Sequence, residues 1–482
     1  MKNIIKLLTI LALVASLSSC NKSFIEKDKP YSMVESKIYS DSNYIKSALL
    51  GCYTNFKITD LKEDPNPSFV GGLAYIVFDC RGEDIVNISN PVTMQETYEM
   101  SVLPTSQENG RIWRCAYKTI NTCNIFIDNL AKYNCAEVLG KDGDKICKQY
   151  EAEAKFLRAY SYYVLVNLYS QPYALNPDAL AVPLRLTGLT SSGNNDCPAS
   201  PIKDVYAQIL EDCIPDALIN KPATYDGVTR ASAAAAHMLR MRVYMAEKNW
   251  GEAIKEGLAV KGYELAEDVT KLYGKDTYEN KEMIFALPMS IQPGDAPNTQ
   301  LSCAEYLSKD ANVCWLNTES GILSIDNYNS DKDARVSKLV STPDDNGYVY
   351  SLKFTDKAQK QDWIPVMRYA ETLLNLAECY ANQANGATNA KAALKQVRQR
   401  SIPTGDELDI DALTSGSIAT AVYNERRLEF ICEGIRGIDI IRRGENFVKK
   451  AESVDLNVAP SGTNYIWPVP DSESKYNKTL GK

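Results

Sequence analysis

The chain has 482 residues, of which 45% are hydrophobic and 24% charged, and its formal net charge is −8 at pH 7. An acidic chain without a cluster of basic residues binds nucleic acid poorly, because phosphate neutralisation needs clustered Lys and Arg, so nucleic acid is excluded as a partner. The length allows roughly three domains at about 150 residues each, although helical-repeat folds often form one long body.

Residues 1–19 have the pattern of an export signal. A basic start is followed by a short apolar stretch at residues 7–15, then by small residues and the sequence "LSSC", which ends at Cys20. This ending resembles the lipobox of bacterial lipoproteins, in which the cysteine is lipidated and becomes the new N-terminus. The apolar stretch is too short to span a bilayer. We therefore predict a lipid anchor at Cys20, and the alternative is an ordinary secretory signal followed by an incidental cysteine.

Residues 58–110 are rich in turn formers, as in "DPNPSFVGG" and "VLPTSQENG". Within them, "YIVFDCRGEDIVN" places Asp79, Arg81 and Asp84 close together. An Arg fork beside a carboxylate can bind neighbouring hydroxyl groups of a sugar. Asp79 and Arg81 are therefore candidate ligand-binding residues, and the alternative is an ion pair on the surface.

Three helix-turn-helix pairs follow, with helices expected to start near residues 151, 231 and 366. They are carried by the stretches "RIWRCAYKTINTCNIFIDNLAKY" with the aromatic helix after it, "ASAAAAHMLRMRVYMAEKNWGEAIKEGLAV" and "PVMRYAETLLNLAECYANQANGATNAKAALKQVRQR". Small and large residues alternate as in tetratricopeptide repeats, although the period is irregular. Such pairs bury their apolar sides only by stacking. The sequence predicts a mostly α fold, with a tetratricopeptide-like scaffold at approximately 111–265 and 365–450 and minor β structure.

The first of these pairs includes "KFLRAYSYYVLVNLYSQPYA", which holds six aromatic rings. On a helix, Phe156, Tyr160 and Tyr163 share one face, and apolar side chains cover more than half of the circumference. This pattern is typical of a helix packed between neighbours. We expect these rings to be core rather than a ligand surface.

The longest irregular stretch is the second insertion, approximately residues 266–364. Trp315 lies within it in "NVCWLNTESG", next to the polar Asn317, whereas Trp113, Trp250 and Trp467 lie in scaffold stretches and are expected in the core. Flat rings bind the C–H faces of sugars, and insertions on a rigid scaffold often carry function. Trp315 is therefore the first candidate for a stacking platform, with Asn317 and Tyr306 as weaker partners; the alternative is packing within the loop itself.

Residues that could carry catalysis have simpler explanations. His237 is the only histidine, and it lies on an Ala-rich helix without a nucleophile motif. Glu425, Arg426, Glu429 and Glu433 recur at three- and four-residue spacing, which predicts ion pairs within one helix. We expect no catalytic residues, no metal and no cofactor. The twelve cysteines after Cys20 include no C-x-x-C pair, and we expect mostly buried thiols with one or two bridges possible.

Several of these stretches, in this order, resemble one family. They are the lipobox, "EAEAKFLRAYSYYVLVNLYSQPYA", "NKEMIFALPMS", "PVMRYAETLLNLAECY", "YNERRLEFICEGIRGIDIIRRG" and "IWPVP". Together they closely resemble the SusD/RagB family of outer-membrane nutrient-binding lipoproteins, over most of the chain.

The resemblance implies one SusD-like domain at residues 20–482, tethered to the outer membrane at the cell surface. It also implies capture of an oligosaccharide and its delivery to a SusC-like TonB-dependent transporter, with the ligand bound by the insertions. Three alternatives stay open: a peptide-capturing member of the same family, a scaffold that binds only protein, and a helical glycoside hydrolase. The hydrolase needs just two carboxylates, whose separation cannot be read from sequence.

Overall fold

The computed structural model describes residues 35–58, 68–87, 94–191, 193, 195–290, 302–451 and 454–480. The predicted signal peptide and Cys20 lie outside these residues. Within them the fold is mostly α, with short strands, as the sequence predicts. No helix in the described ranges is both long enough and apolar enough to cross a membrane.

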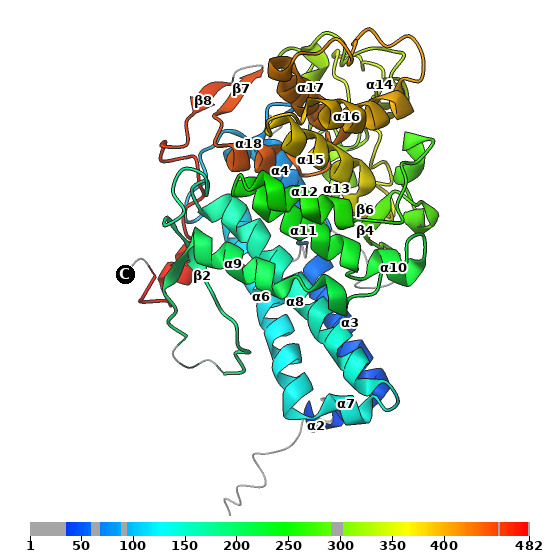
Figure 1. Cartoon of the computed structure of the whole chain (residues 1–482). Helices are drawn as coiled ribbons and strands as arrows, with labels where there is room; N and C mark the ends of the chain where they lie inside the picture. The colour runs from blue at the N-terminus through cyan, green and yellow to red at the C-terminus, as the bar shows by residue number, and fades with distance from the viewer. Residues whose placement is uncertain are drawn as a thin grey trace, which may run out of the picture.

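The N-terminal part of the described chain is a narrow helical bundle that extends away from the main body (Figure 1). Its long helices pack against one another, and two short helices lie at its far end. These elements are α2 (Glu35–Ile38), α3 (Ser42–Ile58), α6 (Gln107–Lys132), α7 (Cys135–Val138) and α8 (Gly143–Tyr169).

The aromatic face of α8 is buried, as expected from its spacing. Phe156, Tyr160 and Tyr163 are at most 6% exposed. The Tyr160 ring meets Phe56 of α3 edge-on with 5.3 Å between centroids, and Phe156 meets Phe285 at 5.5 Å. Edge-to-face pairs of this kind stabilise packing beyond the area that they bury. These rings hold α8 between its neighbours and present no binding surface.

The other two predicted pairs form the layers of the main body. They are α11 (Ala233–Ala246) with α12 (Trp250–Ala259), and α15 (Tyr369–Ala381) with α16 (Ala387–Ser401). Side chains of Ser232 and Asn249 accept hydrogen bonds at the N-termini of α11 and α12, so both helices begin at a polar cap. Gly257 lets α12 approach closely, since a Cβ there would lie 2.8 Å from Leu376 and Met241. The pairs therefore stack into a continuous core.

Strands are few in the described residues, and each belongs to an antiparallel two-stranded ladder. The ladders are β1 (Ile85–Val86) with β5 (Trp315–Leu316), β2 (Leu180–Pro183) with β3 (Ala199–Pro201), β4 (Met283–Leu287) with β6 (Ile364–Arg368), and β7 (Phe447–Ala451) with β8 (Val454–Val458). The β1–β5 ladder joins the two loop-rich insertions.

The remaining helices of the described residues connect these elements. They are α4 (Leu73–Arg81), α5 (Gln95–Tyr98), α9 (Ile202–Asp212), α10 (Tyr225–Thr229), α13 (Cys303–Leu307), α14 (Ala334–Leu339), α17 (Ser415–Glu429), α18 (Arg436–Arg443) and α19 (Asp471–Ser474). In the described ranges, 3₁₀ turns lie at Pro215–Ala217, Val269–Leu272, Thr277–Glu279 and Ile322–Ser324.

The carboxylates around α17 form ion pairs with other elements, which corrects the prediction of pairs within one helix. Arg368, at the end of β6, bonds Glu282 at 2.7 Å, Glu429 at 2.5 Å and Glu433 at 2.8 Å. Glu425 pairs with Arg335 at 2.6 Å. The reason is burial, because a buried carboxylate needs cations from whatever packs against it.

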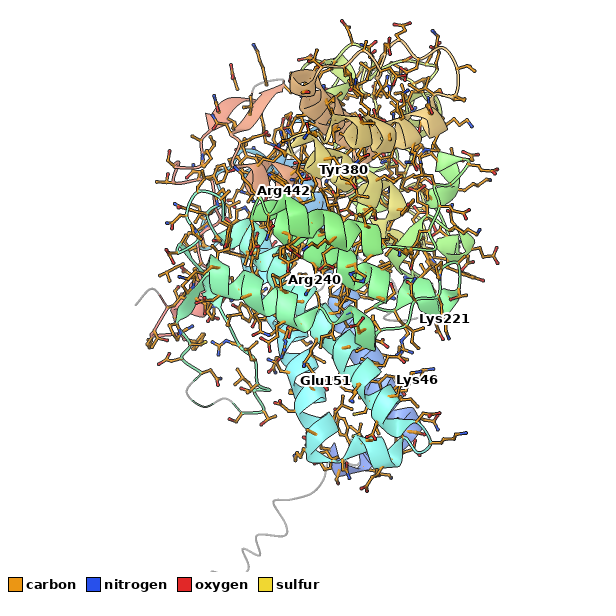
Figure 2. All side chains as sticks on the ribbon, viewed as in Figure 1. Lys46, Glu151, Lys221, Arg240, Tyr380 and Arg442 are labelled. Carbon is orange, nitrogen blue, oxygen red and sulfur yellow. The ribbon has the colours of Figure 1, made fainter. Side chains whose placement is uncertain are left out.

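A second buried cluster centres on α18. Arg442 bonds Glu378 of α15 at 2.7 Å and Asp439 of its own helix at 2.8 Å. Figure 2 shows Arg442 well inside the outline of the molecule, whereas the labelled Lys46 and Glu151 lie on the narrow bundle. Asp439 with Arg442 is thus a pair within one helix, as the spacing predicts. These charges fix α15 against α18.

All twelve cysteines after Cys20 lie in the described residues, and all are free. Ten are buried, and Cys147 and Cys197 are half-buried. Buried thiols are confirmed, and no bridge forms among them. In the core they act as small apolar side chains.

Candidate ligand-binding site

The candidate site lies where the two insertions meet. Trp315 of β5 pairs with Val86 of β1, and the backbone N–H of Asn317 donates to the carbonyl of Asp84 at 2.9 Å. The N–H of Leu316 donates in turn to the carbonyl of Val349 at 2.7 Å. Three segments far apart in sequence are thereby fixed side by side around Trp315.

Trp315 is stacked on a tyrosine that the sequence analysis did not identify. The rings of Trp315 and Tyr348 lie 4.1 Å apart between centroids, at an interplanar angle of 19°. Trp315 is 8% exposed and packs in a small cluster with Tyr98 and Tyr350, whereas Tyr348 is half-buried. The tryptophan is therefore no open platform: Tyr348 covers one of its faces and is the more accessible ring.

The stack lines a cavity of about 160 Å³. The residues around it include Trp315, Asn317, Thr318, Glu319, Asn346 and Tyr348. Thr318, Glu319 and Asn346 are exposed, so an aromatic wall is combined with a polar rim. Small-molecule sites combine apolar surface with a few polar groups that fix orientation, and this cavity does so at a volume below the roughly 300–1,000 Å³ of such sites.

A turn at residues 344–347 holds Tyr348 in place. The Asp344 side chain accepts hydrogen bonds from the backbone N–H groups of Asn346 and Tyr348, both at 2.9 Å. Gly347 has φ of +84°, a conformation that favours glycine. Tyr350 donates its hydroxyl to Asp344 at 3.0 Å, and burial, together with this bond, raises the pKa of Tyr350 to about 12. The stacked ring is therefore held before any ligand arrives.

Asn317 borders the cavity, but its side chain is occupied by the loop. Its amide donates to the Glu83 carbonyl at 2.9 Å and to the Ser320 hydroxyl at 3.0 Å. Its carbonyl oxygen accepts from the N–H groups of Glu319 and Ser320, both at 3.0 Å. Asn317 shapes the rim of the site, and Glu319 and Thr318 are the side chains that face solvent beside it.

Asp79 and Arg81 lie in the interior, on α4, and not on a ligand surface. Asp79 accepts the N–H of Gly434 at 2.8 Å, and burial raises the pKa of Asp79 well above its usual range. Arg81 donates to the carbonyls of Asn167, at 3.1 Å, and Tyr465. Burial lowers the pKa of Arg81 to about 10. The expected exposed pair is thus corrected, because backbone partners from distant segments occupy both side chains.

Tyr306 is also remote from solvent. It lies on α13, is 3% exposed and belongs to the main core, and burial raises its pKa. The structure does not bring Tyr306 into the cavity beside Trp315 and Asn317.

His237 makes a structural contact between two scaffold helices. Its Nδ1 lies 2.6 Å from a carboxylate oxygen of Glu256, so α11 is joined to α12. The described residues contain no group of three or more His, Cys, Asp or Glu side chains placed to hold a metal. Neither His237 nor Glu256 lines the cavity beside Trp315.

Comparison with known proteins decides the family. A family model described as "SusD family" matches residues 312–482, and one described as "Starch-binding associating with outer membrane" matches residues 77–245. A crystal structure of a SusD superfamily protein from Bacteroides fragilis is 45% identical, covers 92% of this chain and 100% of its own, and superposes with a TM-score of 0.85. The chain belongs to the SusD family.

More distant relatives also match this chain, in structure or in sequence. A SusD superfamily protein from Bacteroides thetaiotaomicron is 21% identical, with 91% of this chain and 99% of its own covered and a TM-score of 0.76. SusD-like protein P25 from Formosa agariphila is 24% identical over 97% of this chain and 96% of its own. The resemblance found in the sequence motifs is therefore confirmed for this SusD-family chain, and so is the tetratricopeptide-like helical fold.

Proposed function

We propose that this SusD-family chain is a cell-surface lipoprotein, anchored through Cys20 in the outer membrane, that captures an oligosaccharide without catalysis. It delivers this ligand to a SusC-like TonB-dependent transporter. The description of one matching family model names starch binding and the outer membrane, and a relative from Bacteroides vulgatus is described as a SusD-like carbohydrate binding protein. Those descriptions concern the relatives and support the proposal for this chain.

The observation that carries the proposal is the stacked pair of Trp315 and Tyr348 beside a polar rim. Sugars present C–H faces that pack on aromatic rings, and their hydroxyl groups need polar partners nearby. Glu319 and Thr318 provide such groups at the edge of the cavity. A cavity of about 160 Å³ suits a single sugar ring of a chain that otherwise runs over the surface, so we expect modest affinity.

Tyr348 is the residue with which to test this site. Trp315→Ala would remove a buried ring, at a cost of about 3–5 kcal/mol of stability, and would confuse loss of fold with loss of binding. Tyr348→Ala removes a half-buried ring from a surface turn. The matched control is Tyr44→Ala, because Tyr44 is 41% exposed on α3, in the helical bundle.

Affinity electrophoresis of the chain beginning at Asn21, in gels containing different polysaccharides, measures the effect. We expect one polysaccharide to retard the wild type and Tyr44→Ala. We expect Tyr348→Ala to migrate freely while still unfolding cooperatively, with a stability lower by about 1–2 kcal/mol because its stacking on Trp315 is lost. Retardation of all three alike would place the ligand elsewhere. If no polysaccharide retards the wild type, peptide capture or a protein-binding scaffold replaces this proposal; release of reducing sugar would favour a hydrolase.

The anchor and the transporter are tested in cells. Cys20→Ser is expected to move the protein from the outer-membrane fraction to the soluble fraction and to remove incorporated radioactive palmitate. Purification of the anchored wild type in mild detergent is expected to bring a TonB-dependent transporter with it. If the Cys20→Ser variant stays in the outer-membrane fraction and still incorporates radioactive palmitate, the lipid anchor at Cys20 is contradicted.

A further inference from the structure

A second cavity lies on a different part of the molecule. It has a volume of about 370 Å³, and it is formed between α6, the loop that follows β2 and the C-terminal segment that includes α19. Its wall contains Tyr117, Asn121, Arg185, Glu473 and Tyr476. It shares no lining residue with the cavity beside Trp315. In Figure 1 the red C-terminal segment lies near β2, away from the β7–β8 hairpin.

The C-terminal wall of this cavity is firmly attached. The Asn477 side chain accepts from the N–H of Cys197 at 3.1 Å and donates to the carbonyl of the same residue at 2.7 Å. Glu473 accepts from the Trp113 indole at 3.3 Å and from Arg185 at 3.4 Å. These bonds fix the C-terminal segment against α6 and the loop after β2, so the cavity exists without a ligand.

The opposite wall is attached in the same way. Asn121 of α6 accepts from the N–H of Leu189 at 2.7 Å and donates to its carbonyl at 3.0 Å. The Tyr117 hydroxyl donates to the carbonyl of Pro183 at 2.8 Å, and burial raises the pKa of Tyr117 well above its usual range. Tyr117 is therefore a neutral ring in a fixed position, and the Leu189 side chain adds apolar surface.

Tyr476 is the most unusual residue at this cavity. It is 83% exposed, more than any other large hydrophobic side chain in the described part of the chain. An aromatic ring in water beside a cavity offers a face for stacking, at the cost of ordering its side chain when the ligand binds. Arg185 lines the same cavity and is half-buried, and among the described residues its guanidinium has one hydrogen-bond partner, Glu473 at 3.4 Å. Further N–H groups of Arg185 are therefore available to hydroxyl oxygens.

We propose that this cavity is a second saccharide-binding site, in which Tyr476 stacks on a sugar ring and Arg185 donates to its hydroxyl groups. The volume of about 370 Å³ is more than twice that beside Trp315 and suits a short segment of about two sugar rings. A concave pocket with two aromatic rings, amides and one arginine fits a compact polar ligand better than a flat protein surface. The proposal extends the proposed function and rests on it for the class of ligand.

Saturation-transfer difference NMR with the chain beginning at Asn21 tests this site directly. The probes are maltose, cellobiose, lactose and xylobiose at millimolar concentration, each with the wild type and with Tyr348→Ala, which lacks the first site. We expect at least one disaccharide to receive saturation from Tyr348→Ala, and the double variant Tyr348→Ala/Tyr476→Ala to bind it about tenfold more weakly. Tyr476→Phe in the same background should keep binding, because the stacking face is retained, and Tyr44→Ala is the control for an exposed tyrosine elsewhere.

The outcomes separate the two proposals. Signals that vanish already in Tyr348→Ala overturn the second site and support the first. Signals that persist equally in Tyr348→Ala and in the double variant overturn the second site and place the disaccharide elsewhere. Signals that survive Tyr348→Ala undiminished and are lost with Tyr476→Ala alone support the second site and overturn the first. If no probe receives saturation from the wild type, the second site is overturned, and polysaccharide electrophoresis decides the proposed function separately.

Discussion

Lys449 is a buried lysine whose charge is linked to the stability of the fold. It lies on β7 and donates to the carbonyls of Cys80 and, at 2.9 Å, Gly82, with its ammonium 3.8 Å from the centre of the Tyr98 ring. Burial lowers the pKa of Lys449 to about 7, a direction that Arg81 reinforces. The ordinary value is 10.5.

A lowered pKa in the folded state makes the protein less stable as the pH falls. Between pH 7 and pH 9 Lys449 is protonated in the unfolded chain and increasingly neutral in the folded one, so the unfolded chain binds about one proton more. Each pH unit then raises the free energy of unfolding by about 1.4 kcal/mol, and by less near pH 7, where Lys449 is half-protonated in the folded protein. The contribution of Lys449 to the free energy of unfolding therefore rises by about 2 kcal/mol from pH 7 to pH 9.

The assay compares thermal unfolding of the wild type and Lys449→Met across this pH range. Lys449→Met also removes the charge that helps to lower the pKa of the Cys80 thiol, so the difference between the two melting temperatures reports Lys449 together with its coupling to Cys80. We expect the wild type to gain stability relative to Lys449→Met as the pH rises. Lys450→Met, an exposed neighbour on the same strand, should follow the wild type. A difference that is constant with pH, or that falls as the pH rises, would refute the reasoning.

Two further substitutions test how the interior is held. Arg368→Met removes one cation from each of three buried carboxylates, which keep only Arg400, Arg335 and Lys353 as partners, and should destabilise the protein by up to about 3–5 kcal/mol. Lys395→Met at an exposed pair should change the melting temperature little, and equal melting temperatures of the two variants would contradict the buried network. Gly434 has φ of +69°, and a Cβ there would lie 2.8 Å from Cα of Tyr75, so Gly434→Ala should lose at least about 1–3 kcal/mol. The control Gly51→Ala, in an open position on α3, should instead raise the free energy of unfolding by about 0.5–1 kcal/mol. A Gly434→Ala protein as stable as the wild type would contradict this prediction, because it would show that the backbone at residue 434 adapts.

The scaffold could be predicted because its signals are local. Apolar spacing and small residues at contact points identify helix pairs wherever both helices are packed. The start of α8 shows the limit: it begins at Gly143, earlier than the expected position near 151, because its first turns are polar and mostly half-exposed or exposed. Apolar periodicity therefore identifies the buried part of a helix but not its exposed polar turns.

The ion pairs show a second limit. Spacing correctly placed Glu425, Glu429 and Glu433 in a structural role, but their partners come from β6, α14 and α16. Arg81 reaches Tyr465, and Asp79 reaches Gly434, across more than 300 positions of sequence. Local sequence cannot tell whether such a charge faces solvent, because that depends on which segment the fold places above it.

Tyr348 had a usable signal that the analysis of Trp315 did not include. The stretch "DDNGY" places Asp and Asn-Gly directly before this tyrosine, a combination that predicts a tight turn. What no local pattern could give is the partner, since the stack forms only because the backbone of Val349 bonds β5 at Leu316. An aromatic residue after a turn in one insertion and a tryptophan in another part of it are each ambiguous alone. In the fold their ring centroids lie 4.1 Å apart, and the two rings together line one cavity. Tyr348 is the more accessible of the two rings, so binding is better tested at Tyr348 than at Trp315.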